Sequence, residues 1–355
     1  MMRIILYPLA LAYTLAVTLR NKLFDWKILR EQTFAAPVIC VGNLAVGGTG
    51  KTPHIEWLIS LLKDKYDVAV LSRGYRRRTK GYVLADETSS AQSIGDEPFQ
   101  IKMKFLDITV AVDSNRRRGI KRLLQSTSET TEKQKLILLD DAFQHRYVKP
   151  SLSILLTDHR RLYTRDLVLP AGRLREPRSG VKRADIIIVT KCRPDTDFPA
   201  IKKEIICPAL YFSTYQYHEI KPVFTDFNHK NTKTCLAGKM VLLLTGIVSP
   251  QPLHAYLSQH AAKVVPVNFP DHHDFSQKDI NRVSDIFDKM GGEKIIVTTE
   301  KDAARLVGNA FLSEKMKKFV YSIGVEVVIL QDRAKELEDN ILCSMLSRGS
   351  ATALP

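Results

Sequence analysis

The hydrophobic positions of the chain fall into short apolar runs separated by longer stretches with helical spacing. Six runs rich in Val, Ile and Leu precede residue 200, at 38–41, 68–71, 108–112, 136–139, 154–157 and 186–190. Runs of four or five residues that are apolar throughout are typical of strands covered on both faces. Because such strands alternate with helical segments, the pattern predicts the α/β class, with a parallel sheet flanked by helices.

A change in this pattern divides the chain. The periodicity stops near residue 208, and residues 225–234 are polar. Beyond them we expect strands at 240–245, 263–267 and 294–298 and helices at 251–260 and 334–346. A chain of 355 residues also exceeds the usual size of a single core. The predicted division is an N-terminal helix at 1–30, a core domain at 31–215, a linker at 216–236 and a smaller α/β domain with a C-terminal helix at 237–355.

The N-terminus carries an apolar segment of another kind. Residues 4–19 are almost continuously apolar, contain no acid and have basic residues on both sides. A spanning helix needs about 20 apolar residues, and this run is shorter. An amphipathic helix lying in the headgroup region of a membrane fits better. A buried core helix, a signal peptide and a true span are the alternatives.

Charge narrows the classes of partner. The net charge is +15, from 53 Lys and Arg against 38 Asp and Glu, so the surface should attract anions. Nothing in the chain resembles an RNA-binding aromatic strand, a zinc finger or a long basic arm, which argues against nucleic acid. An acidic membrane and phosphorylated ligands remain. The five cysteines lack the spacing of a zinc or redox site and are expected to be reduced thiols in a cytosolic protein.

A glycine-rich loop follows the first expected strand and precedes a helical stretch. It consists of Gly47, Gly48, Thr49, Gly50, Lys51 and Thr52. In a P-loop, glycines let backbone N–H groups face phosphate oxygens, the lysine reaches the β and γ phosphates, and the threonine hydroxyl can bind Mg²⁺. Ala45 stands where the usual pattern has its first glycine. The order of strand, loop and helix still predicts a P-loop NTPase-like site for ATP and Mg²⁺, rather than a chance turn.

An acid at the end of a neighbouring strand forms the second half of such a site. Asp140 and Asp141 follow the apolar run at 136–139 and are candidates to hold Mg²⁺ opposite Thr52. The alternative is a polar strand end that caps the following turn.

Transfer of a phosphoryl group to an alcohol also requires a group that removes the hydroxyl proton. From the residues alone, Asp96 is either such a base or a helix cap. The cluster Asp-His-His-Asp at 271–274 could tune a base, bind a metal or form a surface turn. Among the arginines, Arg173 lies on a glycine-containing loop between prolines and is the preferred contact for phosphate charge.

Taken together, these segments resemble the tetraacyldisaccharide 4'-kinases of lipid A synthesis. The matching segments run in family order at 41–53, 72–75, 95–98, 113–116, 140–145, 169–177, 271–272 and 298–302. The resemblance implies transfer of the ATP γ phosphate to the 4'-hydroxyl of a tetraacylated glucosamine disaccharide 1-phosphate. It also implies two α/β domains and an N-terminal helix that meets the bacterial inner membrane at its cytoplasmic face.

The resemblance implies roles for residues at matching positions. Lys51 and Thr52 correspond to the phosphate and magnesium ligands, and Asp140 and Asp141 are the candidates that complete the metal site. Members often carry glycine where this chain has Ala142, a difference from which we expect little consequence.

For the acceptor end, the resemblance implies that Asp96 accepts the hydroxyl proton, supported by His272, and that Arg173 contacts phosphate. The expected substrate contacts are Asn43, Arg73, Glu97, Arg116, Gln144 and His145. The rival function is a membrane-associated regulatory P-loop ATPase. That class usually carries an extra lysine near the start of its loop, and residues 44–50 contain none.

Overall fold

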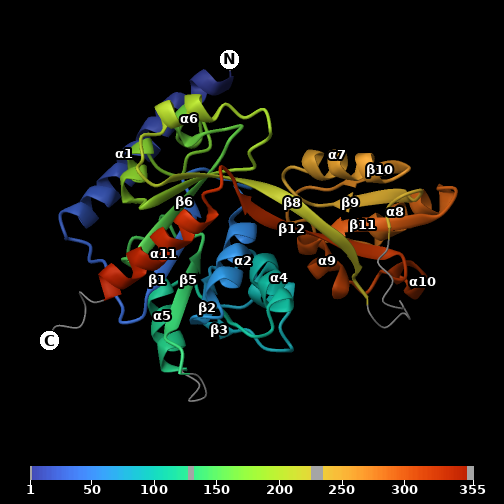
Figure 1. The fold of residues 1–355 in the computed structure, drawn as a ribbon, viewed down its shortest axis with the longest axis horizontal. Coiled ribbons are helices and arrows are strands. Elements are labelled where there is room, and N and C mark those ends of the chain that lie inside the picture. Colours follow the sequence, from blue (N-terminus) through green and yellow to red (C-terminus); the bar gives the residue numbers. More distant parts are fainter. Residues whose placement is uncertain (1, 127–131, 225–234, 350–355) are drawn as a thin grey trace.

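The computed structural model describes residues 2–126, 132–224 and 235–349. These residues form two lobes joined by a pair of long strands (Figure 1). The described strands make one 12-stranded sheet, in the order β10-β9-β11-β12-β8-β7-β6-β1-β5-β2-β4-β3. The mostly parallel sheet with helices on its faces confirms the predicted α/β class.

The first lobe contains the larger part of the sheet. Its strands are β1 (Val38–Asn43), β2 (Asp67–Ser72), β3 (Val83–Leu84), β4 (Thr109–Val112), β5 (Lys135–Asp140), β6 (Leu152–Asp158) and β7 (Ile186–Thr190). All pair in parallel with their neighbours except β3, which is antiparallel to β4. Strands β1 and β5 are buried at every position, as their continuous apolar runs predicted.

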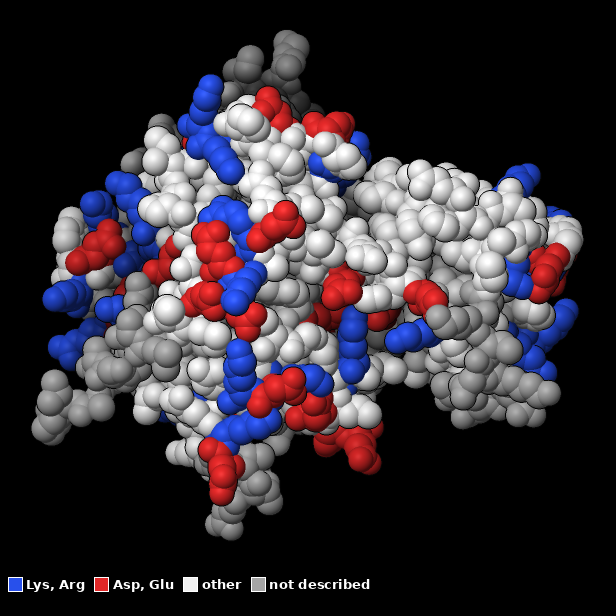
Figure 2. Space-filling model, viewed as in Figure 1, with Lys and Arg blue, Asp and Glu red and all other residues white. Residues whose placement is uncertain are grey.

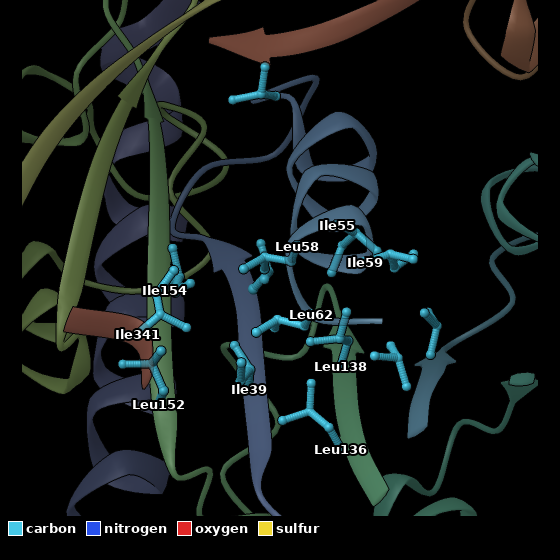
Figure 3. Packing of buried hydrophobic residues seen from close by; sticks show 14 of the residues in the cluster. Ile39, Ile55, Leu58, Ile59, Leu62, Leu136, Leu138, Leu152, Ile154 and Ile341 are labelled. Atoms are coloured by element: carbon cyan, nitrogen blue, oxygen red, sulfur yellow. The ribbon is translucent and has the colours of Figure 1, made fainter. Parts of the chain in front are cut away.

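Helices cover both faces of this sheet. They are α1 (Met2–Asp25), α2 (Lys51–Leu62), α3 (Ala91–Ile94), α4 (Asp96–Lys104), α5 (Arg116–Gln125) and α6 (Phe198–Glu204), with short 3-10 turns at Tyr163–Arg165 and Arg178–Arg183. Figure 3 shows Leu58 and Leu62 of α2 facing the sheet near Ile39. Each such buried aliphatic side chain contributes about 1.5–3 kcal/mol. This packing fixes the start of α2, and with it the glycine-rich loop, relative to β1.

The second lobe is a smaller α/β unit. Its elements are β9 (Met240–Thr245), α7 (Gln251–His260), β10 (Lys263–Asn268), α8 (Gln277–Lys289), β11 (Lys294–Thr299), α9 (Glu300–Val307) and α10 (Glu314–Lys317). Helix α8 buries Ile280, Val283 and Phe287, which recur at helical spacing, and begins with a capping box between Ser276 and Asp279. The strands expected in this lobe are therefore present within a residue of their predicted ends.

The connection between the lobes differs from the predicted linker. Strand β8 (Leu210–Pro222) pairs in parallel with β7 at its start and antiparallel with β12 (Val320–Ile329) along its length. The predicted linker at 216–236 thus begins inside a strand. Its outer half is exposed or half-buried except at Ile220, so it lacks the apolar run by which the other strands are recognised. Residues 225–234 of that prediction lie outside the described residues.

The last helix, α11 (Ala334–Gly349), also differs from the predicted division. Because β12 returns to the first lobe, the chain that follows it packs there rather than on the smaller unit. Leu337 and Ile341 are fully buried in the same cluster as Leu152 and Ile154 of β6. Figure 3 shows Ile341 beside these two residues.

Helix α1 lies along the first lobe (Figure 1). The Tyr13 hydroxyl donates to the Arg175 carbonyl, and the Arg20 guanidinium donates to the Gln144 carbonyl. On its outward side lie four leucines that are each more than half exposed, Leu9, Leu11, Leu15 and Leu19. No helix among the described residues is both long and apolar enough to cross a bilayer.

Candidate active site

A cavity of about 1060 Å³ lies where the two lobes meet. It opens at the carboxyl ends of the first lobe's parallel strands, the usual place for a ligand in an α/β sheet. Acidic and basic side chains lie close together near this junction (Figure 2). Both lobes line the cavity, with the glycine-rich loop on one side and the segment around His272 on the other.

The predicted phosphate-binding loop forms the floor of the cavity. Gly47 and Gly50 have φ angles of 110° and 88°, in the left-handed region that favours glycine. A side chain at Gly50 would also collide with the Tyr215 hydroxyl. Helix α2 begins immediately after Gly50, so its positive N-terminal end and the Lys51 ammonium face the place where phosphates would lie.

Asn43 supports this loop from below. Its side chain is fully buried, and its Nδ2 donates to Thr49 Oγ1 at 2.7 Å. Asn43 does not line the cavity, although the resemblance implied a substrate contact there. The structure gives it the position of a residue that shapes the loop.

The segment 169–177 runs beside the loop, and a different arginine from the expected one reaches the cavity. Arg173 is exposed and outside the cavity lining, and its carbonyl accepts a hydrogen bond from the Val46 N–H at 2.8 Å. Arg175 lines the cavity, and its Nη1 donates to both carboxylate oxygens of Asp141 at 2.8 and 3.0 Å. The arginine that sequence reasoning missed is therefore two residues further along the same motif.

The adjacent acids Asp140 and Asp141 have different surroundings. The Ser72 hydroxyl donates to Asp140 Oδ2 at 3.1 Å, whereas the buried Oδ1 of Asp140 has no hydrogen-bond partner among the described residues. Burial and the neighbouring Asp141 raise the pKa of Asp140 to about 6. Burial acts in the same direction on Asp141, but Lys51, at 3.6 Å, and Arg175 lower the pKa of Asp141 below its ordinary value.

These residues fit a magnesium ion. Mg²⁺ prefers oxygen ligands and is usually held by one or two carboxylates together with phosphate oxygens. Asp140 offers a buried oxygen with no partner among the described residues, and Thr52, whose side chain carries a hydroxyl, lines the same cavity. Asp141 is occupied by Lys51 and Arg175, which makes Asp140 the better ligand.

Asp96 and His272 meet across the junction of the lobes. Asp96 is the first residue of α4 in the first lobe, and His272 lies on a loop of the second lobe, 176 residues away in the chain. His272 Nδ1 lies 2.8 Å from Asp96 Oδ2. Since a carboxylate oxygen accepts, Nδ1 carries a ring proton, and in the neutral ring the lone pair is then on Nε2. His272 lines the cavity, whereas Asp96 does not, and the neighbouring His273 instead contacts Asp279.

Helix α9 places two cations beside this pair. Lys301 Nζ lies 3.0 Å from Glu97 Oε1 and 3.3 Å from His272 Nε2. Arg305 Nη2 donates to Asp96 Oδ2 at 2.6 Å. Although burial acts to raise it, the hydrogen bonds from His272 and Arg305 hold the pKa of Asp96 well below its usual range. Lys301 belongs to a segment that carried the resemblance, whereas no sequence signal singled out Arg305.

The other expected substrate contacts also line the cavity, with Gln144 and His145 near α1 and Glu97 beside Lys301 of the second lobe. Arg73, Glu97, Arg116, Gln144 and His145 all line the cavity, together with Arg20 from α1. Burial and the nearby arginines, Arg116 first, lower the pKa of His145 to about 4, so its ring is neutral at physiological pH. The arginines Arg20, Arg73 and Arg116 make this wall of the cavity cationic, and α1 borders it through Tyr13, Val17 and Arg20.

Comparisons with known proteins agree with this arrangement. The family model described as tetraacyldisaccharide-1-P 4'-kinase matches residues 2–345. The chain is 50% identical to the tetraacyldisaccharide 4'-kinase of Bacteroides thetaiotaomicron, over 95% of this chain and 92% of that protein. It is 41% identical to that of Porphyromonas gingivalis, over 95% and 96%. The crystal structure of LpxK from Aquifex aeolicus in complex with ATP superposes with a TM-score of 0.74 at 27% identity, covering 97% of this chain and 100% of that one. The chain therefore belongs to the tetraacyldisaccharide 4'-kinase family.

Proposed function

We propose that this chain uses ATP to phosphorylate the 4'-hydroxyl of tetraacyldisaccharide 1-phosphate, forming lipid IVA, and that the cavity between the lobes performs the transfer. The observation that carries the proposal is the meeting of a phosphate-binding loop from one lobe with an Asp–His pair that spans both. A regulatory ATPase needs only the phosphate-binding loop, because it transfers the phosphoryl group to water and requires no site for an alcohol acceptor.

The nucleotide end is held by the glycine-rich loop. Lys51 pairs with the β and γ phosphates, and the N-terminus of α2 adds its dipole. Thr52 and Asp140 would hold Mg²⁺, which neutralises charge on the transferring phosphoryl group when it is bound. Asp141 and Arg175 restrain Lys51 and so keep its ammonium directed into the cavity.

The acceptor end is served by His272. Its Nε2 takes the proton of the 4'-hydroxyl as the oxygen forms a bond to the γ phosphorus and the bond between that phosphorus and the β–γ bridging oxygen breaks, releasing ADP. Asp96 holds the proton on Nδ1 and so keeps the lone pair on Nε2. This assignment exchanges the roles that the resemblance implied, because His272 lines the cavity and Asp96 lies behind its ring.

The cationic wall near α1 suits the anionic and polar parts of the acceptor. Arg73 and Arg116 offer guanidinium groups for a phosphate or for sugar oxygens, and Gln144 and His145 offer neutral polar contacts. The acyl chains would then leave the cavity beside α1, whose exposed leucines can enter a bilayer.

The proposed location is the cytoplasmic face of the inner membrane, held peripherally by α1. The test is flotation with vesicles of zwitterionic and anionic phospholipid. The double variant Leu11→Ser/Leu15→Ser should lose most vesicle binding while keeping the circular dichroism of the parent chain. Equal flotation of the variant and the parent would argue against α1 as the anchor.

The reaction is tested with γ-labelled ATP and acylated disaccharide 1-phosphate in detergent micelles. Label should enter the lipid, and His272→Gln should lower kcat by about 100-fold or more with nucleotide binding unchanged, the usual scale of a general base. Steady release of free phosphate without labelled lipid would support the regulatory ATPase instead. If His272→Gln keeps full activity while Asp96→Asn does not, the proton goes to Asp96.

A further inference from the structure

We infer that Arg305 is a positioning residue for the phosphoryl transfer, because it fixes the Asp96 carboxylate that in turn holds His272. The inference rests on the roles proposed above for Asp96 and His272. It adds a third member to that pair, contributed by a helix to which the sequence pattern assigns no part in the reaction.

Arg305 and His272 both contact the same carboxylate oxygen of Asp96. Arg305 Nη2 and His272 Nδ1 both lie against Asp96 Oδ2, at 2.6 and 2.8 Å. Asp96 Oδ1 accepts no hydrogen bond from the described residues. Two donors at one oxygen restrain the rotation of the carboxylate, so Arg305 sets the direction from which Asp96 holds the imidazole ring.

Arg305 is itself rigidly held. Its side chain is 4% exposed, and its Nη1 donates to Asp302 Oδ1 at 2.8 Å. Asp302 is fully buried and accepts hydrogen bonds from the Gly246 N–H at 3.0 Å and from the Thr299 hydroxyl at 2.8 Å. The guanidinium is therefore anchored to the ends of β9 and β11. It presents its second nitrogen to Asp96 from a fixed position and cannot move with the carboxylate.

This chain of contacts crosses the junction of the lobes. Asp96 belongs to α4 of the first lobe, and Arg305 to α9 of the second. The carboxylate can be held only when the two helices are in contact, as they are in this structure. Arg305 thus links the arrangement of the proton acceptor to the approach of the lobes.

The charges around Asp96 and His272 are nearly balanced, so the loss of one cation should change the electrostatic environment of the pair. The acids facing it are Glu97, Asp271 and Asp302, and the cations are Lys301 and Arg305, with Arg76 donating to the His272 carbonyl. Arg305 Nη2 is 3.5 Å from His272 Nδ1. Removing this guanidinium takes away one of the two cations beside the ring and leaves Lys301 as the other, so a positive charge on the ring is repelled less.

The experiment compares three changes at Arg305 in the full chain with labelled ATP and the acylated disaccharide. Arg305→Met should lower kcat by about tenfold or more and leave the KM for ATP within about twofold. The acid limb of the kcat/KM profile should move to higher pH by about one unit. Arg305→Lys, which keeps a cation, should restore most of kcat and of the limb. Since Arg305→Met strands the buried Asp302, the double variant Asp302→Asn/Arg305→Met removes both charges and keeps the test valid if the single variant fails to fold.

Lys104→Met is the matched control. It breaks another of the ion pairs between α4 and α9, with Glu300 at 2.9 Å, together with the pair between Lys104 and Glu56 of α2, and it does not touch Asp96. If Arg305 only docks the two helices, Lys104→Met and the Arg305 variants should lower kcat alike and leave the acid limb of the kcat/KM profile unmoved. That result would overturn the inference. The inference would also be overturned if Asp302→Asn/Arg305→Met kept the kcat and the pH profile of the wild type while His272→Gln was impaired. If His272→Gln and Asp96→Asn both keep full activity, the proposed roles of the pair fail first, which is a different result.

Discussion

Two carboxylates in this protein are largely buried and are shifted in opposite directions. Asp140, at the end of β5, has a raised pKa because it is buried beside Asp141 and one oxygen has no partner among the described residues. Asp96, at the start of α4, has a lowered pKa because His272 and Arg305 outweigh its burial. The comparison indicates that Asp140 is suited to bind a cation and Asp96 to hold a neighbouring side chain in place.

The largest difference should appear in catalysis. Asp140→Asn should lower kcat by about 100- to 1000-fold, because the change removes charge stabilisation from the transferring phosphoryl group. Asp141→Asn should cost less, since its partners Lys51 and Arg175 remain. Label transfer to lipid at saturating ATP and Mg²⁺ measures both. Equal losses in the two variants would mean that the acids share one role and that the contrast drawn for Asp140 is incorrect.

The same substitution should stabilise the protein when nucleotide and metal are withheld. The pKa of Asp140 is about 6 in the folded state against an ordinary 3.8, so the folded state binds this proton more tightly than the unfolded state does. Its stabilising effect is therefore complete below about pH 4 and is lost as the pH rises through 6.

Asp140→Asn cannot ionise, so it should exceed the parent in free energy of unfolding by about 1–3 kcal/mol at pH 8 and match it near pH 4. Urea denaturation in EDTA at the two pH values measures the difference. A less stable variant at pH 8 would mean that the Asp140 carboxylate is compensated in the folded protein.

These two regions also differ in how far the sequence could predict them. The Asp140 region is local: each predicted residue follows a strand of one parallel sheet, so the carboxyl ends of β1 and β5 bring Lys51, Thr52 and Asp140 together. The Asp96 region depends on β8 and β12, which carry the second lobe back over the first. The outer half of β8 falls in the predicted linker because it has no apolar run.

Contacts across the lobes could therefore be predicted only by resemblance to a family. Asp96 and His272 were named in that way, but their order of action depends on which side chain faces the cavity. Arg305 could not be found, because α9 contains buried alanines and a leucine at ordinary helical spacing and the arginine among them looks like any surface cation. The choice of Arg173 over Arg175 has a similar cause: only the fold decides which arginine of the loop points inward.

A smaller effect should appear in the pH dependence of magnesium use. A proton on Asp140 competes with the metal, so the apparent affinity for Mg²⁺ should fall about tenfold for each pH unit below 6. The nucleotide also takes up protons in this range, and Asp140→Asn serves as the control because that contribution remains in it. Titration of activity with Mg²⁺ from pH 5 to 8 should show a steeper slope for the parent. Identical slopes would remove Asp140 as the titrating ligand.

The smallest predicted effect is on the stability of an Asp96 variant, and its sign is opposite to that predicted for Asp140→Asn. Asp96→Asn weakens two hydrogen bonds to charged or polar donors, so the free energy of unfolding should fall by about 1 kcal/mol at neutral pH. Because the pKa of Asp96 is lowered in the folded state, the loss should be the same at pH 6 and pH 8. Asp107→Asn is a suitable control, since its ion pair with Lys63 is more than half exposed on the Asp107 side and should contribute little. A gain in stability for Asp96→Asn would show that its burial outweighs Arg305 and His272, and the contrast between the two carboxylates would then fail.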